Sequence, residues 1–262
     1  MSFRLIQHPR MEGQMDMAID EALTEAVGEG RSPQVVRLYG FSPPTLSLGR
    51  FQPARGLADA RALAADGVTL VRRPTGGHAV LHDGELTYCV ILSREKIEAS
   101  LGSTRKRAVY EFIARILVAG LANLGVTGVI NASQKGDAHN PDCFGSAGEY
   151  EISSSAGRKL IGSAQMTTRR AILQHGSIPW ENPGLKVFRY LRVEQPLDSH
   201  PPSSLDEETG RRHSFEQVRD AFSAAFRASL QAVDSDLAAA EEEAARRILQ
   251  EKYASDEWNL AR

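Results

Sequence analysis

The sequence predicts an α/β (α+β) fold in which mixed β-sheets are flanked by helices. Two patterns indicate this class: stretches with apolar residues at helical spacing, and strand-like stretches joined by glycine-containing turns. They alternate irregularly and show no internal repeat, which favours mixed sheets over a regular parallel barrel. With 42% hydrophobic residues, the 262-residue chain can bury a large core. We therefore predict one continuous domain over residues 1–262.

The N-terminal part of the chain is expected to provide strands around an amphipathic helix. Apolar residues recur at helical spacing from Met15 to Val27, and Gly28 follows as a helix end. The predicted elements are a strand at Phe3–Ile6, the helix Met15–Val27, strands at Val35–Tyr39 and Thr45–Leu48, a helix at Ala58–Ala65 and a strand at Val68–Val71.

A β-hairpin is the clearest local prediction. Asp83-Gly84 suits the positive φ angles of a tight turn and separates strands at His78–His82 and Glu85–Leu92. Alternation in the second strand puts one set of side chains on each face: Leu86, Tyr88, Val90 and Leu92 on one, and Thr87, Cys89 and Ile91 on the other.

The C-terminal part is expected to continue the same alternation of helices and strands. Gly136 and Pro141 lie in a polar stretch that indicates a loop. The predicted elements are a helix at Ala108–Leu124, a strand at Val126–Ile130, a loop at Ala132–Asp142, a second hairpin of Tyr150–Ser154 with Lys159–Met166, a strand at Ile172–Ile178, a surface segment at Glu194–His213, and two closing helices at Phe215–Leu230 and Leu237–Leu249.

Charge and apolar patterning exclude several classes of protein. The 31 Lys and Arg residues nearly balance 33 Asp and Glu residues, which argues against a nucleic-acid partner held by a broad basic surface. No apolar run approaches the ~20 residues needed to cross a bilayer, and the N-terminus does not resemble a secretion signal. Two cysteines are too few for a disulfide scaffold or a Cys-rich zinc module. We expect a cytoplasmic protein without membrane partners.

The segment from Arg72 to Val80 is a candidate ligand-binding loop. Gly76 and Gly77 let the backbone approach a ligand closely, and two adjacent arginines can bind an anion. A tight strand connection with solvated arginines is an equally good interpretation of the same residues. The segment matches neither the Walker phosphate loop nor the Gly-x-Gly-x-x-Gly dinucleotide motif.

Histidines and one lysine are further candidates. His82 and His175 have no partner at metal-ligand spacing, so we interpret both as hydrogen-bonded structural residues and predict no metal site. Lys159 begins a strand that continues with the small residues Gly162 and Ser163, which leave room for a ligand beside its ammonium. Such an ammonium can hold a carbonyl or phosphate oxygen, or lower the pKa of a nearby thiol. A solvated surface lysine is the alternative.

The two cysteines lie in different surroundings. Cys89 is placed in an apolar strand and is interpreted as a buried, unreactive thiol. Cys143 follows the polar loop, where a nucleophile would be accessible. Taken alone, the local sequence favours a free loop cysteine without function.

Several motifs, taken in order, resemble the lipoate–biotin protein ligase superfamily, and specifically its lipoate-ligase and octanoyltransferase branch. The resemblance covers essentially the whole chain. It rests on the segments Asp16–Ala22, Pro44–Gln52, Arg72–Asp83, Glu85–Tyr88, Gly157–Gln165, Leu173–Ile178 and Lys252–Asn259. It implies the biotin/lipoate protein ligase catalytic-domain fold, with mixed, mainly antiparallel sheets and surrounding helices.

Cys143 separates two activities within this branch. Lipoate ligases use ATP and need no cysteine nucleophile, whereas the cysteine-dependent octanoyltransferases carry Cys-Phe followed shortly by Tyr-Glu. Cys143-Phe144 and Tyr150-Glu151 match the second pattern. The resemblance therefore implies an octanoyltransferase of protein lipoylation that forms a thioester at Cys143. An ATP-dependent lipoate ligase, an amidotransferase between lipoyl domains and a non-catalytic acyl-binding scaffold are the alternatives.

The resemblance also implies the partners and the site. Octanoyl-acyl-carrier protein would be the donor, a lipoyl-domain protein such as the glycine cleavage H protein the acceptor, and no cofactor or metal would be required. The predicted catalytic residues are Cys143 and Lys159, and the predicted substrate-binding residues are Arg72, Arg73, Gly76, Gly77, His78, His82, Gly162 and Ser163.

Overall fold

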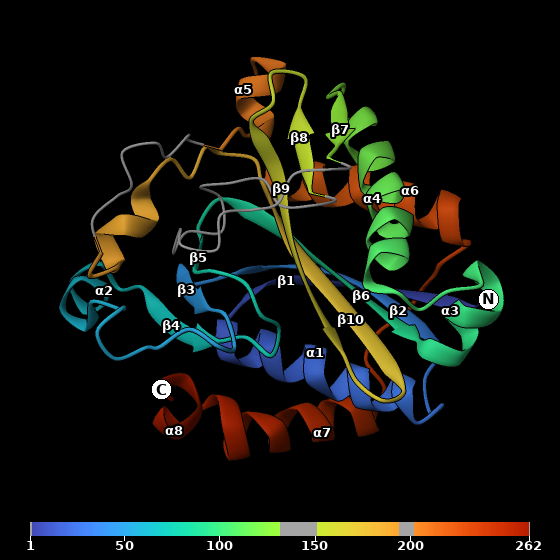
Figure 1. The fold of residues 1–262 in the computed structure, drawn as a ribbon, viewed down its shortest axis with the longest axis horizontal. Helices are drawn as coiled ribbons and strands as arrows, with labels where there is room; N and C mark the ends of the chain where they lie inside the picture. Colours follow the sequence, from blue (N-terminus) through green and yellow to red (C-terminus); the bar gives the residue numbers. More distant parts are fainter. Residues whose placement is uncertain (1, 132–150, 194–201, 262) are drawn as a thin grey trace.

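The computed structural model of the chain describes residues 2–131, 151–193 and 202–261 (Figure 1). Cys143 and the predicted loop Ala132–Asp142 lie outside the described residues, as does part of the predicted surface segment. The strands are β1 (Phe3–Met11), β2 (Gln34–Phe41), β3 (Thr45–Leu48), β4 (Thr69–Arg72), β5 (Val80–His82), β6 (Glu85–Ser93), β7 (Gly128–Ile130), β8 (Ile152–Ser154), β9 (Lys159–Thr167), β10 (Ala171–Pro179) and β11 (Val233–Asp234). The helices are α1 (Gly13–Gly28), α2 (Ala60–Asp66), α3 (Arg94–Leu101), α4 (Lys106–Ala122), η1 (Lys186–Tyr190), α5 (Leu205–Thr209), α6 (Phe215–Leu230), α7 (Ala239–Ile248), η2 (Leu249–Tyr253) and α8 (Asp256–Asn259).

Two sheets organise the described residues. The larger has the order β11-β1-β2-β6-β10-β9-β8-β7, and the smaller has the order β4-β3-β5. Strands β11, β1 and β2 pair in parallel, as do β3 and β4, while the other pairs are antiparallel. This arrangement confirms the predicted class of mixed, mainly antiparallel sheets.

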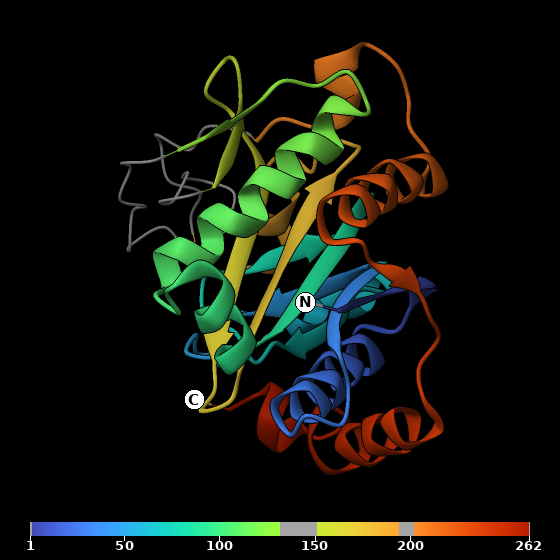
Figure 2. The same ribbon diagram turned by 90° about the vertical axis from the view of Figure 1, so that its right-hand side faces the viewer.

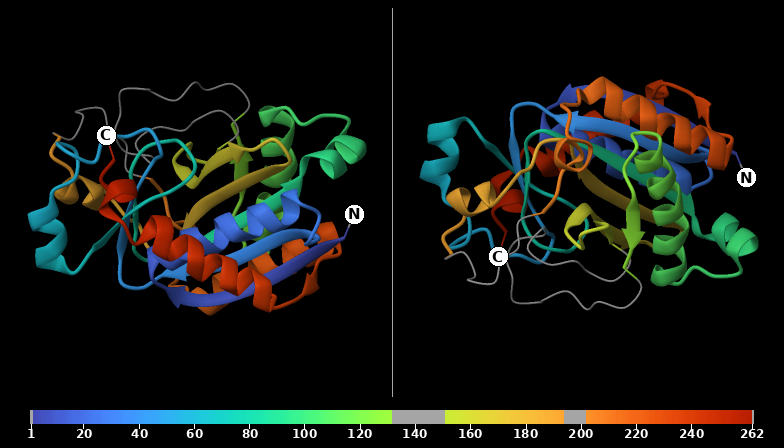
Figure 3. Two further views of the ribbon diagram at one scale, coloured as in Figure 1. Left: turned by 90° about the horizontal axis from the view of Figure 1, so that it is seen from below. Right: turned by 90° about the horizontal axis from the view of Figure 1, so that it is seen from above.

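Helices cover both faces of the larger sheet (Figure 2). Helices α4 and α6 lie on one face, and α1 and α7 lie on the other, as the two views in Figure 3 show. The central strand β6 serves both cores because its side chains alternate. Leu86, Tyr88, Val90 and Leu92 join the α4–α6 core, whereas Cys89 and Ile91 join the α1–α7 core. Both predicted faces of this strand are confirmed, and so is the burial of Cys89.

The smaller sheet has a hydrophobic cluster of its own beneath α2 and η1. Leu46, Leu48 and Leu81 from the sheet meet Leu63 from α2 and Val187 from η1. Strand β3 pairs with β5, and the chain passes from β5 in the smaller sheet to β6 in the larger one at Asp83-Gly84.

The hairpin predicted at this turn is wrong. Gly84 has the expected positive φ of 74°, but β5 pairs with β3, whereas β6 pairs with β2 and β10. A turn residue determines only the local direction of the chain. The strands that pair with β6 are determined by the burial of both of its faces. The second predicted hairpin is confirmed, because β8 and β9 pair antiparallel.

Some elements differ from the prediction in extent or burial. Strand β1 continues to Met11, and α3 forms a helix before α4 that apolar spacing did not indicate. The predicted surface segment includes α5, where Ser204 and Leu205 are buried. Within the described ranges, no helix has both the length and the apolar composition needed to cross a membrane.

Candidate active site

A cavity lies where the two sheets meet. Its walls come from α1, β2, β3, β5, β6, β9, β10 and the segment before β5, and the space between them is about 420 Å³ including the open mouth. Met17, Tyr39, Phe41 and Val80 give it apolar surface, and the Phe41 ring stacks on His82 with their centroids 4.0 Å apart. A mostly apolar cavity with a few oriented polar groups suits a ligand with an aliphatic chain and a polar end.

Four of the predicted substrate-binding residues line this cavity. Arg73 and His82 approach from the smaller sheet, and Gly162 and Ser163 approach from β9. Ser163 is held in place because its hydroxyl lies 2.7 Å from the Tyr88 hydroxyl. Gly176, opposite Ser163 in β10, could not carry a side chain, since a Cβ there would lie 2.2 Å from the Gly162 carbonyl oxygen.

Arg72 does not line the cavity and instead makes structural hydrogen bonds. Its buried guanidinium donates hydrogen bonds to the carbonyl oxygens of Gly49 and Gln52 in the segment after β3. It also donates to the carbonyl oxygens of Trp258 and Ala261 near the end of the chain. Arg72 thus joins the smaller sheet to the C-terminal residues.

Arg73 closes the predicted binding loop on itself. Its guanidinium donates to the carbonyl oxygens of Gly76 and His78 at 2.9 and 2.6 Å, and to the Ser47 hydroxyl at 3.1 Å. Gly77 has a φ of 92°, and a Cβ there would lie 2.9 Å from the Arg73 guanidinium. The geometry therefore gives Gly77 two reasons to be glycine. We define the loop Arg73–His78 as the site loop.

Gly49 packs against the backbone of the site loop at Gly76 and Gly77. A Cβ at Gly49 would lie 2.0 Å from the Gly77 carbonyl oxygen, a contact that requires the backbone to move. We expect Gly49→Ala to lower the free energy of unfolding by about 2 kcal/mol, because the new methyl group meets the backbone of the site loop, which cannot move aside as a flexible side chain would. Gly76→Ala is the matched control, because its Cβ would meet only the Phe51 ring at 3.6 Å. Urea denaturation of both variants checks this expectation, and equal losses would contradict it.

Lys159 lies at the start of β9, three residues before the cavity-lining part of that strand. Its Nζ donates to Glu151 Oε1 at 2.7 Å, and the two residues are only 4% and 7% exposed. The register of β8 and β9 shifts at this point, so that Leu160 and Ile161 both enter the same core. A bulge of this kind redirects neighbouring side chains. The solvated-surface interpretation of Lys159 is therefore wrong.

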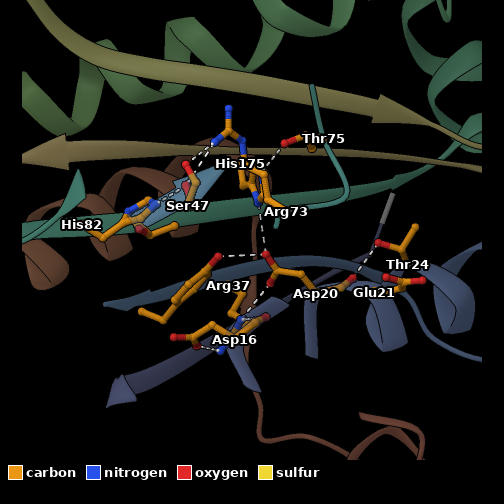
Figure 4. Close-up of polar contacts among 12 residues, drawn as sticks. Asp16, Asp20, Glu21, Thr24, Arg37, Ser47, Arg73, Thr75, His82 and His175 are labelled. Carbon is orange, nitrogen blue, oxygen red and sulfur yellow. Dashed lines mark hydrogen bonds and ion pairs between the residues drawn. The ribbon is translucent and has the colours of Figure 1, made fainter. Parts of the chain in front are cut away.

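Two carboxylate–imidazole–hydroxyl relays meet the site loop (Figure 4). In the first, His82 Nδ1 lies 2.6 Å from Glu85 Oε1, and its Nε2 lies 2.8 Å from the Ser47 hydroxyl that also contacts Arg73. The second runs from Asp20 on α1 through His175 on β10 to Thr75 in the loop. The prediction that both histidines are hydrogen-bonded is confirmed.

Asp20 belongs to a buried cluster of charges around Arg37. The Arg37 guanidinium is fully buried and pairs with both Asp16 and Asp20. Burial raises the pKa of Asp16 well above its usual range. Burial acts in the same direction on Asp20, but hydrogen bonding from His175 and the charge of Arg37 outweigh it and lower the pKa of that carboxyl. The pKa values of the two carboxyls beside Arg37 are thus shifted in opposite directions, and Asp20 is the one held in its ionised form.

His8 makes the stability of this cluster depend on pH. Its Nδ1 accepts a hydrogen bond from Arg37 Nε at 2.9 Å, and burial together with the charge of Arg37 lowers the pKa of His8 from 6.5 to about 4. The unfolded chain therefore takes up this proton first as the pH falls. The contribution of His8 to stability is fully present above pH 6.5 and is lost as the pH falls toward 4.

The check is urea denaturation between pH 7 and pH 4.5. We expect wild type to lose more stability over this range than His8→Asn, which keeps an acceptor atom but does not titrate. Parallel curves for the two proteins would contradict the role of His8.

Sequence reasoning did not assign Thr75, Ser47 or Asp20 to the site. A signal was present for Asp20, because Asp16 and Asp20 are spaced four apart along one edge of the apolar stripe of the predicted helix. Charged residues on a buried face need partners. Across the part of the chain that the structure describes, no group of three or more His, Cys, Asp and Glu side chains is arranged to hold a metal ion.

Comparisons with known proteins identify the family of the chain. Residues 12–227 match the family model of the lipoyl protein ligase A/B catalytic domain. The protein named octanoyltransferase LipM of Symbiobacterium thermophilum is 35% identical, over 99% of this chain and 98% of its own. Its namesake of Moorella thermoacetica is 37% identical, over 98% and 97%.

Solved structures show the same fold. A lipoate-protein ligase A bound with ATP superposes with a TM-score of 0.82 at 23% identity, covering 99% of each chain. The Thermoplasma acidophilum protein Ta0514, described as a putative lipoate protein ligase with bound lipoic acid, superposes with a TM-score of 0.81 at 23% identity over 100% of each chain. From its sequence matches, the chain belongs to the lipoyl protein ligase A/B catalytic-domain family and is an acyltransferase of the octanoyltransferase branch of protein lipoylation.

Proposed function

We propose that this octanoyltransferase takes its acyl group from octanoyl-acyl-carrier protein and passes it to a lysine of a lipoyl-domain protein, in the cytoplasm. Residues 1–262 would act as one catalytic domain, using neither metal nor cofactor. The observation that carries the proposal is the similarity, along nearly the whole of both chains, to proteins named octanoyltransferase. The cysteine pattern at Cys143 and the buried ammonium of Lys159 support it.

Two transfers at carbonyl carbon make up the proposed reaction. The Cys143 thiolate attacks the donor thioester, the carbon–sulfur bond to the carrier breaks, and the carrier thiolate leaves and takes up a proton. The amine of the acceptor lysine then attacks the octanoyl-Cys143 thioester, forms the amide and releases the Cys143 thiolate as the amine loses its proton. Each step is easier than direct transfer because a thiolate is both a good nucleophile and a good leaving group.

Lys159 would assist the first transfer as a positive charge. An ammonium lowers the pKa of a neighbouring thiol and stabilises negative charge that develops on the carbonyl oxygen. Burial strengthens both effects because water screens the charge less. Glu151 fixes the ammonium from one side through its 2.7 Å hydrogen bond.

In this proposal the octanoyl chain occupies the cavity between the sheets. Met17 and Phe41 would contact its methylene groups, while Ser163 and the site loop lie at polar parts of the wall. Of the predicted binding residues, Arg73, His82, Gly162 and Ser163 would then line the acyl site directly. Gly76, Gly77 and His78 would shape the loop, and Arg72 would hold the segment after β3 that supports it.

The test compares three donors on one unmodified lipoyl domain, with octanoylation measured by intact mass. The donors are octanoyl-acyl-carrier protein, octanoate with ATP and Mg²⁺, and a second lipoyl domain already octanoylated. We expect modification from the carrier protein without ATP. Modification only with octanoate and ATP would show a ligase instead, and modification only from the second lipoyl domain would show an amidotransferase.

A further inference from the structure

His175 stands between a buried carboxylate and the site loop. Its Nε2 lies 2.7 Å from the Thr75 hydroxyl, and its Nδ1 lies 3.3 Å from Asp20 Oδ2 (Figure 4). The three residues are each no more than 5% exposed. His175 also lines the cavity, so the relay connects helix α1 to the loop along the cavity wall.

The partners of Asp20 fix which nitrogen of His175 carries the proton. Asp20 Oδ1 accepts from Arg37 Nη1 at 2.8 Å, and Oδ2 accepts from the Tyr39 hydroxyl at 2.9 Å. A carboxylate held by a guanidinium and a phenol is ionised and acts only as an acceptor. His175 Nδ1 must therefore donate to it.

The Thr75 hydroxyl must then donate to His175. Burial lowers the pKa of His175 and outweighs the Asp20 carboxylate, which acts in the opposite direction, so the imidazole is neutral at neutral pH. A neutral imidazole with hydrogen on Nδ1 has a bare Nε2, which is an acceptor. The chain of hydrogen bonds consequently runs in one direction, from Thr75 through His175 to Asp20.

Thr75 is the point at which the site loop is held from both sides. Its hydroxyl binds His175, and its carbonyl oxygen accepts a hydrogen bond from the Arg50 backbone N–H at 2.8 Å. Arg73 then ties the following carbonyl groups of Gly76 and His78 to itself. The orientation of Thr75 thus sets where the Arg73 guanidinium meets the cavity.

We propose that His175 is a positioning residue for octanoyl transfer: held as a single tautomer by Asp20, it orients Thr75 and thereby places the site loop against the acyl group. The proposal rests on the proposed function in one respect, that the cavity is the acyl site. A relay that only stabilises the fold would affect unfolding and turnover together, whereas a positioning relay affects turnover beyond its effect on stability.

The first experiment removes the Thr75 hydroxyl while keeping its shape. Thr75→Val keeps the branched side chain and loses the donor, and Thr75→Ser keeps the donor and loses a methyl group. We expect Thr75→Val to lower kcat for octanoyl transfer by about tenfold or more, since small displacements of a positioned group have effects of this size. Thr75→Ser should stay within about threefold of wild type, because its hydroxyl can make the same bond.

Thermal unfolding separates positioning from stability in the same variants. If Thr75→Val folds and loses turnover that Thr75→Ser retains, the proposal is supported. Equal turnover in the two variants, whether both retain it or both lose it, would overturn the proposal, because turnover would then not depend on the Thr75 hydroxyl.

The second experiment uses the wild-type protein and does not depend on any variant folding. Nitrogen-15 NMR of the histidine rings reports which nitrogen of His175 is protonated. We expect hydrogen on Nδ1 and a bare Nε2, and the opposite tautomer would refute the relay. In Thr75→Val, the pKa of His175 should rise, because the hydroxyl no longer stabilises the neutral ring.

These readouts distinguish this proposal from the proposed function. Wild type that fails to octanoylate a lipoyl domain from any donor would remove the proposed function, while the tautomer of His175 would still decide whether the relay exists. Active wild type with equal Thr75 variants would leave the proposed function intact and refute the positioning role.

Discussion

We expect Cys143→Ala to form no octanoyl adduct with octanoyl-acyl-carrier protein and to lose at least about 10³-fold in turnover, as removal of a covalent nucleophile does in enzymes of comparable chemistry. Intact mass after a short incubation with the donor alone should show one octanoyl group on wild type and none on the variant. The assay needs no acceptor, so it isolates the first transfer from the second.

Cys89 is the matched control for this experiment. It is fully buried in the α1–α7 core, and burial raises the pKa of its thiol well above the usual range, so it cannot supply a thiolate. Cys89→Ala should keep the adduct and the turnover, at a cost in stability of about 1 kcal/mol for the lost packing. An adduct that persists in Cys143→Ala, or disappears in Cys89→Ala, would contradict the assignment of Cys143.

The second large effect is expected at the Lys159–Glu151 pair. Lys159→Met removes the buried ammonium but keeps an unbranched side chain, so we expect loss of about 10²-fold or more in turnover. The same change removes the cation that lies 2.7 Å from the Glu151 carboxylate, at a site where both residues are nearly inaccessible. Breaking a buried pair from one side costs about 3 kcal/mol of folding stability.

A double variant separates these two consequences. In Lys159→Met with Glu151→Gln, the carboxylate charge is removed as well, so much of the stability should return. Turnover should not return, because the ammonium is still missing. Chemical denaturation and octanoyl transfer on wild type, both single variants and the double variant make a complete double-mutant cycle. Recovery of turnover in the double variant would show that Lys159 acts only through stability.

Much of the fold could be predicted because its signals are local. The apolar spacing of α1 and α6 and the alternation in β6 are properties of short stretches of sequence. The structure confirms that the apolar side chains they predict to be buried lie in the two cores. The bounds of β3 agree with the prediction for the same reason. These elements need no knowledge of distant residues.

Long-range partners could not be predicted in this way. The strand that pairs with β5 is β3, chosen by burial of Leu81 against the small-sheet core rather than by the turn at Gly84. Likewise, nothing near Arg72 in the sequence indicates that its guanidinium binds carbonyl groups about 186 residues away.

The candidate site was predictable in its residue types more than in its connections. Paired glycines and arginines indicated a ligand loop, and the structure shows that one arginine closes that loop while the other supports it from behind. The spacing of Asp16 and Asp20 indicated that Asp20 needs a buried partner, but it could not identify His175, which is 155 positions away. The hydrogen bond of Thr75 to His175, 100 positions away, leaves no local pattern at all.

The hydrogen bonds of Arg72 join the C-terminal residues to the segment that supports the site loop. The carbonyl oxygens of Trp258 and Ala261 accept hydrogen bonds from the Arg72 guanidinium. The same guanidinium donates to the carbonyl oxygen of Gly49, which packs against the site loop. Local opening of these residues would therefore deprive the Arg72 guanidinium of two acceptors, and we expect it to weaken the hold of Arg72 on the segment beneath the site loop.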